Sequence, residues 1–433
     1  MFNMKSRTFQ MIAFFSAIAF LAGCNSKGTA DNNPAAEKPP EPVTLQLASQ
    51  GVVILDEEFQ QVTNEFLRKK YPHITINYNP DAKGTTLDDL IASGNTPDIV
   101  VTYNGMLPSY RTKDLVFDMT PLLQNIDLNK FEPNYIQDVR NAAEKGELYG
   151  LPINVNYHAM YYNKTIFDKF GAPYPTDGMD WTAVLELAKK VTRMDGGTQY
   201  RGLDPGNGIV WISQPLSVAA IDPFTDKATM NNDQWKRVFE LVKSIYDIPG
   251  NGRISESPKN QFMKSQTLAI LLDLNILNQL AEAEKEGLVW DIAQYPSYPE
   301  KPNTYGNASV YTMIATKPSK YHKEVAQVIE LFTSEEVQLE LSRRGLLSPL
   351  KSEKVKQELG ANKPNLKDKS LPSIFKSKPV PYPVASRFRT KAESIASAKF
   401  WEYANGQIDV NTALAQADEE INQMVAAELG AQK

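Results

Sequence analysis

Hydrophobic positions in the first quarter of the chain alternate between a period of two and a helical period. Residues 43–47 and 74–78 alternate and predict two strands, and residues 59–67 between them place their apolar side chains on one helix face. Residues 87–92 predict a short helix, and residues 97–103 a third strand with an almost continuous apolar run. Strand, helix, strand, helix, strand predicts an α/β fold built on parallel strands.

Later segments continue this mixture of strands and helices. Residues 267–272 form an apolar run whose periodicity does not distinguish a strand from the end of a helix, whereas residues 289–293 and 309–314 predict strands. Asp180 is expected to cap a helix, and Thr333 with Glu336 is a candidate capping box. No repeat of about 20–50 residues is present, which excludes solenoids and propellers.

Length and composition indicate a globular protein of two domains. A chain of 433 residues exceeds what one hydrophobic core usually serves. Its 42% hydrophobic and 22% charged residues are globular proportions. The net charge of −5 and the lack of a long basic run argue against a dedicated nucleic-acid binder.

The usual catalytic and metal-binding parts are scarce. One cysteine and three widely separated histidines argue against a disulfide scaffold, a cysteine-built metal centre and a histidine-rich metal site. The sequence has no Gly-x-Ser-x-Gly, His-Glu-x-x-His or Gly-x-x-x-x-Gly-Lys motif. We therefore expect no catalytic residues, no metal, no cofactor and no enzymatic activity.

The N-terminus has the layout of a secretory signal. Lys5 and Arg7 precede an apolar stretch, residues 11–22, which is too short to cross a ~30 Å hydrocarbon layer. The tetrapeptide ending at Cys24 resembles the bacterial lipobox, which implies cleavage before Cys24 and acylation of its sulfur. We expect residues 1–23 to be a signal peptide; a membrane-spanning anchor, or an ordinary signal with an incidental cysteine, is the alternative.

The segment after Cys24 predicts a tether. Residues 25–42 contain four prolines and no apolar residue larger than alanine, so they cannot bury enough surface to order themselves. We expect the lipidated cysteine and a disordered tether to occupy residues 24–42.

Several motifs follow one another in the order of a known family. Pro97-Asp98-Ile99-Val100 resembles family-1 extracellular solute-binding proteins, the receptors of ABC importers, and so does the run from Leu148 to Lys164. Three later motifs fit in order: Asp180-Trp181-Thr182, Ile314-Ala315-Thr316 and Gly345-Leu346-Leu347-Ser348-Pro349. The resemblance spans roughly Val43 to the C-terminus.

The resemblance implies a two-lobed, periplasmic-binding-protein-like α/β fold of type II with a ligand cleft and a three-crossing hinge. The expected lobes are residues 43–153 plus 306–345 and residues 154–305 plus 346–433, with crossings near residues 152–156, 298–306 and 345–350. It also implies a monomeric receptor on the extracellular face of the membrane, anchored through Cys24, that binds a carbohydrate or oligosaccharide by lobe closure. Its partners would be ABC permease subunits and a separate ATPase, with no nucleic acid.

Candidate ligand contacts are chosen for the chemistry of sugars, which present flat apolar faces rimmed with hydroxyls. Some candidates follow strands or a buried run, at the ends where open α/β sheets bind ligands; others lie on the expected crossings or after a glycine-rich turn. The candidates are Gln50, Tyr103, Asn104, Asn154, Asn156, Tyr157, Trp211, Asp273 and Tyr305. Each candidate also has a structural alternative: it packs in a loop, caps an element or forms hydrogen bonds with the hinge backbone. Trp181, Trp235 and Trp290 lie in periodic elements and are expected in the core.

Three other functions remain open. A surface lipoprotein with a vestigial cleft, or a sensor partner of a membrane kinase, would keep the same fold. A lipid-anchored glycosidase would need two opposed carboxylates across the cleft.

Overall fold

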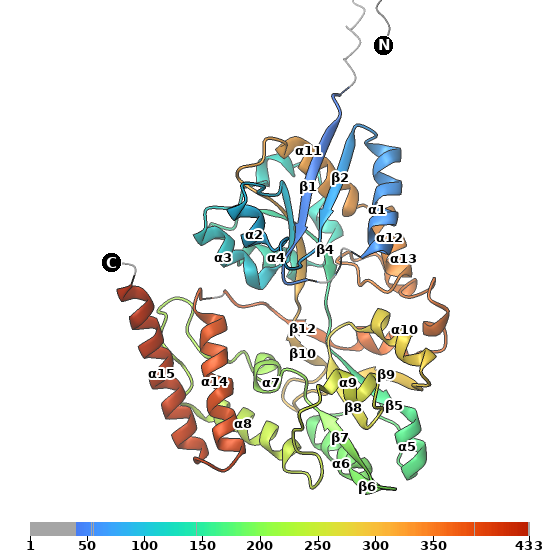
Figure 1. Cartoon of the computed structure of the whole chain (residues 1–433), viewed down its shortest axis with the longest axis vertical. Coiled ribbons are helices and arrows are strands. Elements are labelled where there is room, and N and C mark those ends of the chain that lie inside the picture. Colours follow the sequence, from blue (N-terminus) through green and yellow to red (C-terminus); the bar gives the residue numbers. More distant parts are fainter. Residues whose placement is uncertain (1–39, 53, 55, 144, 385, 432–433) are drawn as a thin grey trace, which may run out of the picture. The chain divides into compact units, whose positions relative to one another are not determined.

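The computed structural model of the chain describes residues 40–431 apart from residues 53, 55, 144 and 385 (Figure 1). From Pro42 onward the chain forms one compact unit. Cys24, the predicted signal peptide and most of the predicted tether lie outside the described residues and stay predictions.

The first sheet contains the strands predicted from the alternating segments. Its order is β2-β1-β3-β11-β4, where β1 (Val43–Ser49) pairs in parallel with β2 (Ile74–Asn79) and β3 (Ile99–Tyr103). From far along the chain, β11 (Val310–Ala315) inserts antiparallel between β3 and β4 (Gly150–Val155). The sheet therefore combines a parallel part predicted from local sequence with a long-range insertion.

Helices pack around this sheet. Asp56 caps α1 (Glu57–Lys70), whose Phe59, Val62 and Leu67 are buried. Ser334 caps α12 (Glu335–Arg343), so the predicted Thr333 cap was wrong by one residue: the Thr333 hydroxyl bonds back to the Ile329 carbonyl instead. The other helices of this part are α2 (Leu87–Ala92), α3 (Leu107–Thr112), α4 (Pro133–Arg140), α11 (His322–Phe332) and α13 (Glu353–Gln357).

The second sheet has the order β6-β7-β8-β5-β9. In it, β8 (Leu268–Asp273) is the apolar run that periodicity could not assign, and β7 (Thr198–Asp204) pairs with it in parallel. Strand β5 (Ala159–Asn163) runs antiparallel to both β8 and β9 (Trp290–Gln294). Strands β6 (Arg193–Asp195) and β9 are the two edges of the sheet. Both faces of β8 are buried, which explains why its sequence lacks alternation.

Helices also accompany the second sheet. The Asp180 cap is confirmed, because its carboxylate accepts a hydrogen bond from the Ala183 amide at the start of α6 (Trp181–Val191). Trp181, Trp235 and Trp290 are buried, as predicted. The remaining helices are α5 (Lys164–Phe170), α7 (Ile209–Ser213), α8 (Asp233–Tyr246), α9 (Pro258–Met263), α10 (Leu277–Lys285), α14 (Arg389–Ala404) and α15 (Val410–Gly430).

Three stretches of chain connect or run beside the two sheets. Residues 156–158 lead directly from β4 to β5. Between β9 and β11 lies β10 (Thr304–Asn307), which pairs with β12 (Lys378–Val380). Residues 345–350, expected as the third crossing, run beside β4, where Leu347 accepts a hydrogen bond from the Val155 amide. The proposed lobe boundaries stay a prediction.

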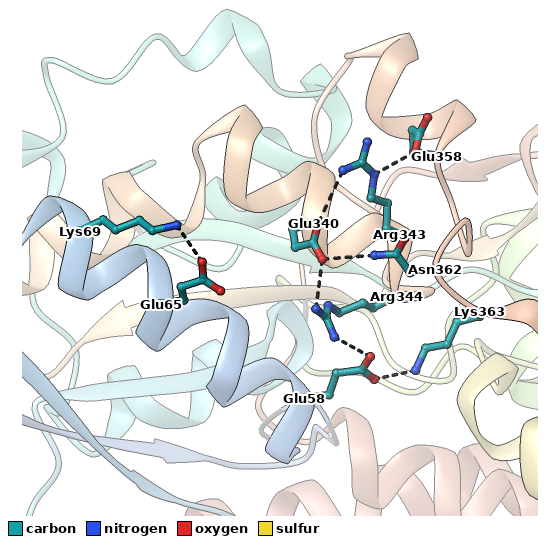
Figure 2. A network of polar contacts seen from close by, with 9 residues as sticks. All are labelled: Glu58, Glu65, Lys69, Glu340, Arg343, Arg344, Glu358, Asn362 and Lys363. Carbon is teal, nitrogen blue, oxygen red and sulfur yellow. Dashed lines mark hydrogen bonds and ion pairs between the residues drawn. The ribbon is translucent and has the colours of Figure 1, made fainter.

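A network of ion pairs joins α1 to the end of α12 (Figure 2). Arg344 donates to Glu58 at 2.8 Å and to Glu340 at 3.0 Å, and Lys363 donates to Glu58 at 2.6 Å. Arg343 pairs with Glu358 in the segment after α13. The network thus fixes the helix end that leads into residues 345–350.

Candidate functional site

A cavity of about 440 Å³ opens between the ends of strands of the first sheet and α7 of the second part of the chain. We call it the cleft and define it by its lining residues. Its aromatic and hydrogen-bonding lining includes Tyr103, Asn156, His158, Asn207, Trp211, Gln214, Asn307, Tyr311 and Tyr382, and its charged lining is Arg387, Arg389 and Glu393.

Tyr103 reaches the cleft because it is the last residue of β3. Burial raises the pKa of its phenol above the ordinary tyrosine value, so the hydroxyl remains a hydrogen-bond donor even at alkaline pH. A Cβ on Gly105 would lie 2.5 Å from the Tyr103 ring and 2.4 Å from the Tyr382 hydroxyl. Glycine at position 105 therefore lets the two aromatic side chains approach the same backbone.

Asn156 reaches the cleft from the first crossing and links both sheets. Its amide nitrogen donates to the Tyr311 hydroxyl at 3.0 Å, and its oxygen accepts from the Asn275 amide at 2.9 Å. Tyr311 belongs to β11 of the first sheet, whereas Asn275 follows β8 of the second. The residue is thus positioned at the hinge by both parts of the protein.

Trp211 is a half-buried residue of α7 that lines the cleft. Its indole packs where Gly206 leaves room, because a Cβ on Gly206 would lie 2.4 Å from the indole ring and 2.4 Å from the Leu272 carbonyl. Gly206 also has a φ of +65°, which L-residues with side chains rarely adopt. The glycine-rich turn predicted from sequence therefore does place an indole at a cavity.

His158 connects Trp211 to the hinge through ring contacts. Its ring centroid lies 4.7 Å from that of Trp211 and 5.3 Å from that of Tyr305, against which it is stacked. Burial lowers the pKa of His158 to about 3. The imidazole is therefore neutral at physiological pH and supplies a ring rather than a charge.

Tyr157 and Tyr305 line a different cavity, of about 640 Å³, which also includes Tyr135 and Phe375. We call it the hinge cavity. Along an extended segment successive side chains face opposite sides, so Asn156 and His158 meet the cleft while Tyr157 meets the hinge cavity.

Three other candidate residues form hydrogen bonds within the protein. Gln50 accepts a hydrogen bond from the Tyr110 hydroxyl at 2.5 Å. Asn104 bonds the Ala308 carbonyl and the Val310 amide, and Asn154 donates to the Leu347 carbonyl at 3.0 Å. These bonds hold the loops near the cleft, but none of the three side chains lines it in this structure.

Asp273 lies at the end of β8 and is buried. It accepts a hydrogen bond from the Leu274 amide at 2.7 Å and pairs with Lys259 at 3.4 Å. Burial raises the pKa of its carboxyl. The structure thus brings Tyr103, Asn156 and Trp211 together at the cleft and places the other candidates around it.

Sequence reasoning missed the residues at the start of α14. Arg389 is the first residue of this helix, and its Nε donates to Glu393 at 2.7 Å. The Arg389 guanidinium also lies 5.0 Å from the ring centroid of Tyr382. The Arg387-Phe388-Arg389 stretch follows an irregular proline-rich segment with no periodicity, and only the fold brings it opposite Tyr103.

Within the part of the chain that the structure describes, no group of three or more His, Cys, Asp or Glu side chains could hold a metal ion. Among those same residues, no helix is both long and apolar enough to cross a membrane.

Two sheets joined by crossing segments, with an aromatic and polar cavity between their ends, define a two-lobed solute-binding protein. Residues 57–367 match the family described as "Bacterial extracellular solute-binding protein", which is more than half of the chain. The chain belongs to this family.

Curated relatives support this membership over different lengths. The sn-glycerol-3-phosphate-binding periplasmic protein UgpB of Rhizobium meliloti is 23% identical over 405 residues, covering 86% of this chain and 91% of that protein. The multiple sugar-binding protein of Streptococcus mutans is 25% identical over 177 residues, but the match covers 40% of this chain and 39% of that protein.

Solved structures show the same fold. An ABC substrate-binding protein from Listeria monocytogenes in complex with cycloalternan matches with a TM-score of 0.75 and 16% identity. The match covers 89% of this chain and all of that one. The two-lobed α/β fold expected from the sequence is therefore confirmed.

Proposed function

We propose that this protein is the receptor of an ABC importer and binds a carbohydrate or oligosaccharide in the cleft. The observation that carries the proposal is the lining of the cleft, where the Trp211 and Tyr103 rings stand beside amide side chains. Rings stack on the apolar faces of sugars, and an amide both donates to and accepts from hydroxyls. Several relatives bear names of sugar-binding proteins, which agrees with this lining.

Lobe closure is the proposed mechanism. Tyr103 and Met106 line the cleft from the first sheet's side, and Asn207 and Trp211 line it from the second. A ligand that contacts both sides stabilises the closed state by its differential affinity for that state. The closed, loaded receptor would then dock on permease subunits powered by a separate ATPase.

The site favours binding over catalysis. Among the described residues that line the cleft, Glu393 is the one carboxylate, and it pairs with Arg389. A glycosidase needs two carboxyl groups facing each other across the sugar. We therefore propose that the ligand leaves the cleft chemically unchanged.

The proposed location is the extracellular face of the membrane. Family membership supports an extracellular receptor, and the lipobox ending at Cys24 supports a lipid anchor followed by a tether. The anchor is tested by mass spectrometry of membrane-extracted protein, in which a diacylglyceryl mass on Cys24 is expected and an unmodified, released N-terminus would refute it.

The binding proposal is tested by a thermal-shift panel of sugars, oligosaccharides, amino acids and peptides. A ligand at 100 times its dissociation constant adds ~2.7 kcal/mol of stability, enough for a shift of a few degrees in a chain of this size. We expect a carbohydrate to raise the melting temperature and to be recovered intact. Hits confined to amino acids or peptides, or a hydrolysed sugar, would contradict the proposal.

A further inference from the structure

The charged groups of the cleft all come from one short stretch of chain. Among the described residues that line it, Arg387, Arg389 and Glu393 are the charged side chains, and His158 is neutral. The cleft lining therefore carries a net positive charge, although the whole chain has a net charge of −5. A local field opposite in sign to the net charge favours an anionic ligand at this site.

Arg389 has an unused donor. Its Nε is taken by Glu393 at 2.7 Å, but its Nη1 is buried and has no hydrogen-bond partner. A buried donor on a charged group is costly to leave unpaired. Glu393 holds one edge of the guanidinium, so the fork is oriented, and the Arg389 side chain keeps 21% of its surface exposed and lines the cleft.

The surroundings of Arg389 are held by the first sheet's side. Its guanidinium stacks near Tyr382, whose amide donates to Asp138 at 2.8 Å and whose carbonyl accepts from Asn141 at 3.1 Å. Both partners lie at or beside α4. Arg389 therefore packs on a tyrosine that residues of α4 hold in place.

The start of α14 adds to this environment. No side chain caps the helix at Phe388, and Thr390 and Glu393 of its first turns line the cleft beside Arg389. The partial positive charge of a helix N-terminus favours an anion there.

We propose that the ligand is an anionic carbohydrate whose acid group pairs with Arg389 while its sugar ring stacks on Trp211. The acid group is a carboxylate, as in a uronate, or a phosphate, since a guanidinium fork pairs with either. This inference rests on the proposed function, because it names the class of carbohydrate that the same cleft accepts.

The experiment is calorimetric titration of the purified protein with matched ligands at low salt. Each set contains a neutral sugar, the corresponding uronate and the corresponding 6-phosphate, for glucose, galactose and mannose as monomers, with neutral and uronate oligomers of equal length. We expect one acidic member to bind at least about tenfold more tightly than its neutral counterpart. Whether that member is the uronate or the phosphate identifies the acid group.

Variants assign the preference to Arg389. Arg389→Gln should bring the acidic and neutral members to similar affinity, whereas Arg389→Lys should keep part of the preference because the charge remains without the fork. Arg237→Gln is the matched control, because Arg237 also pairs with a carboxylate and lies 4.7 Å from a tyrosine ring centroid, but outside the cleft lining. The double variant Arg389→Gln/Glu393→Gln removes the unpaired acid if the single variant folds poorly.

The outcomes separate the two proposals. Tighter binding of neutral members would overturn the anionic ligand and leave the carbohydrate receptor standing. Acid preference that persists in Arg389→Gln would overturn the role of Arg389. A folded protein that binds no carbohydrate in any set would contradict the proposed function as well.

Discussion

Trp211 illustrates how a single residue acquires its role from its neighbours. The indole is half-buried because Gly206 lacks a side chain at the point where the ring packs. His158 supports it from the hinge side at 4.7 Å between ring centroids. A ring held in this way loses little conformational freedom when a sugar stacks on it, which favours tight binding.

Replacing Trp211 by alanine should weaken carbohydrate binding about fivefold to thirtyfold, because the variant loses the ring platform, worth ~1–2 kcal/mol. The matched control is Trp401→Ala, since Trp401 is equally half-buried but packs on Tyr246 away from the cleft lining. Calorimetry of both variants, after checking that each is folded, measures the difference. Equal losses of affinity would contradict the assignment of Trp211 as a platform.

His158 should make the protein less stable in acid. Because burial lowers its pKa to about 3, the unfolded chain takes up a proton near pH 6.5 that the folded protein refuses. The stabilisation is complete above pH 6.5 and is lost as the pH falls toward 3, at ~1.4 kcal/mol per pH unit.

His158→Phe keeps a ring between Trp211 and Tyr305 but cannot be protonated. Urea unfolding at pH 7.5 and pH 4.5 should show the variant gaining ~2–3 kcal/mol relative to the wild-type protein over this range. Other titrating groups are common to both proteins and cancel in the difference. Parallel pH dependences would show that the imidazole is protonated in the folded state.

The carboxylate of Glu58 helps to hold helix α1 against the rest of the protein. Burial alone would raise the pKa of Glu58, but hydrogen bonds from Lys363 and Arg344 outweigh it and lower the pKa. Its stabilisation is therefore present at neutral pH and decreases as the pH falls below the ordinary glutamate range. The pairing fastens α1 to the helix end before residues 345–350.

Glu58→Gln should lower the free energy of unfolding by about 1 kcal/mol, because two cations lose their charged partner in a partly buried network. Glu65→Gln is the matched control on the same helix, since Glu65 pairs with Lys69 at the exposed surface, and its effect should be smaller (Figure 2). Urea unfolding in low and high salt measures both. An equal effect of the two variants would contradict a special role for the network.

Elements with a clear period were predictable, and those defined by distant partners were not. The apolar run of residues 99–103 predicted β3, and the capping side chain of Asp180 predicted the start of α6. By contrast, β10 and β12 are short and exist because they pair with each other across the chain. The apolar run of β8 was compatible with a strand or a helix, and its pairing with β7 shows that it is a strand.

The same distinction holds for the candidate site. Tyr103 and Trp211 were predicted because a strand end and a glycine-rich turn are local signals. The sequence predicted that Tyr157 lies on the first crossing. It did not predict which side of that crossing faces the cleft, because this depends on how the two sheets pack. No local sequence pattern predicted Arg389 as a site residue, because its place at the cleft beside Tyr103 and its contact with Tyr382 arise only in the folded protein.

At the scale of the whole molecule, the first crossing separates two cavities. Asn156 and His158 line the cleft, and Tyr157 lines the hinge cavity. The contact from Trp211 through His158 to Tyr305 physically joins the two cavities. If the lobes close as proposed, their movement about this crossing would alter both cavities together.

The measurement that tests the account most directly is a crystal structure of the protein with the carbohydrate that binds best in the panel. The account predicts a sugar ring on Trp211, a hydrogen bond to Asn156, and contacts from Tyr103 and Trp211 to the same ligand molecule. Carbohydrate bound in the hinge cavity or on the outer surface, with the cleft empty, would contradict it.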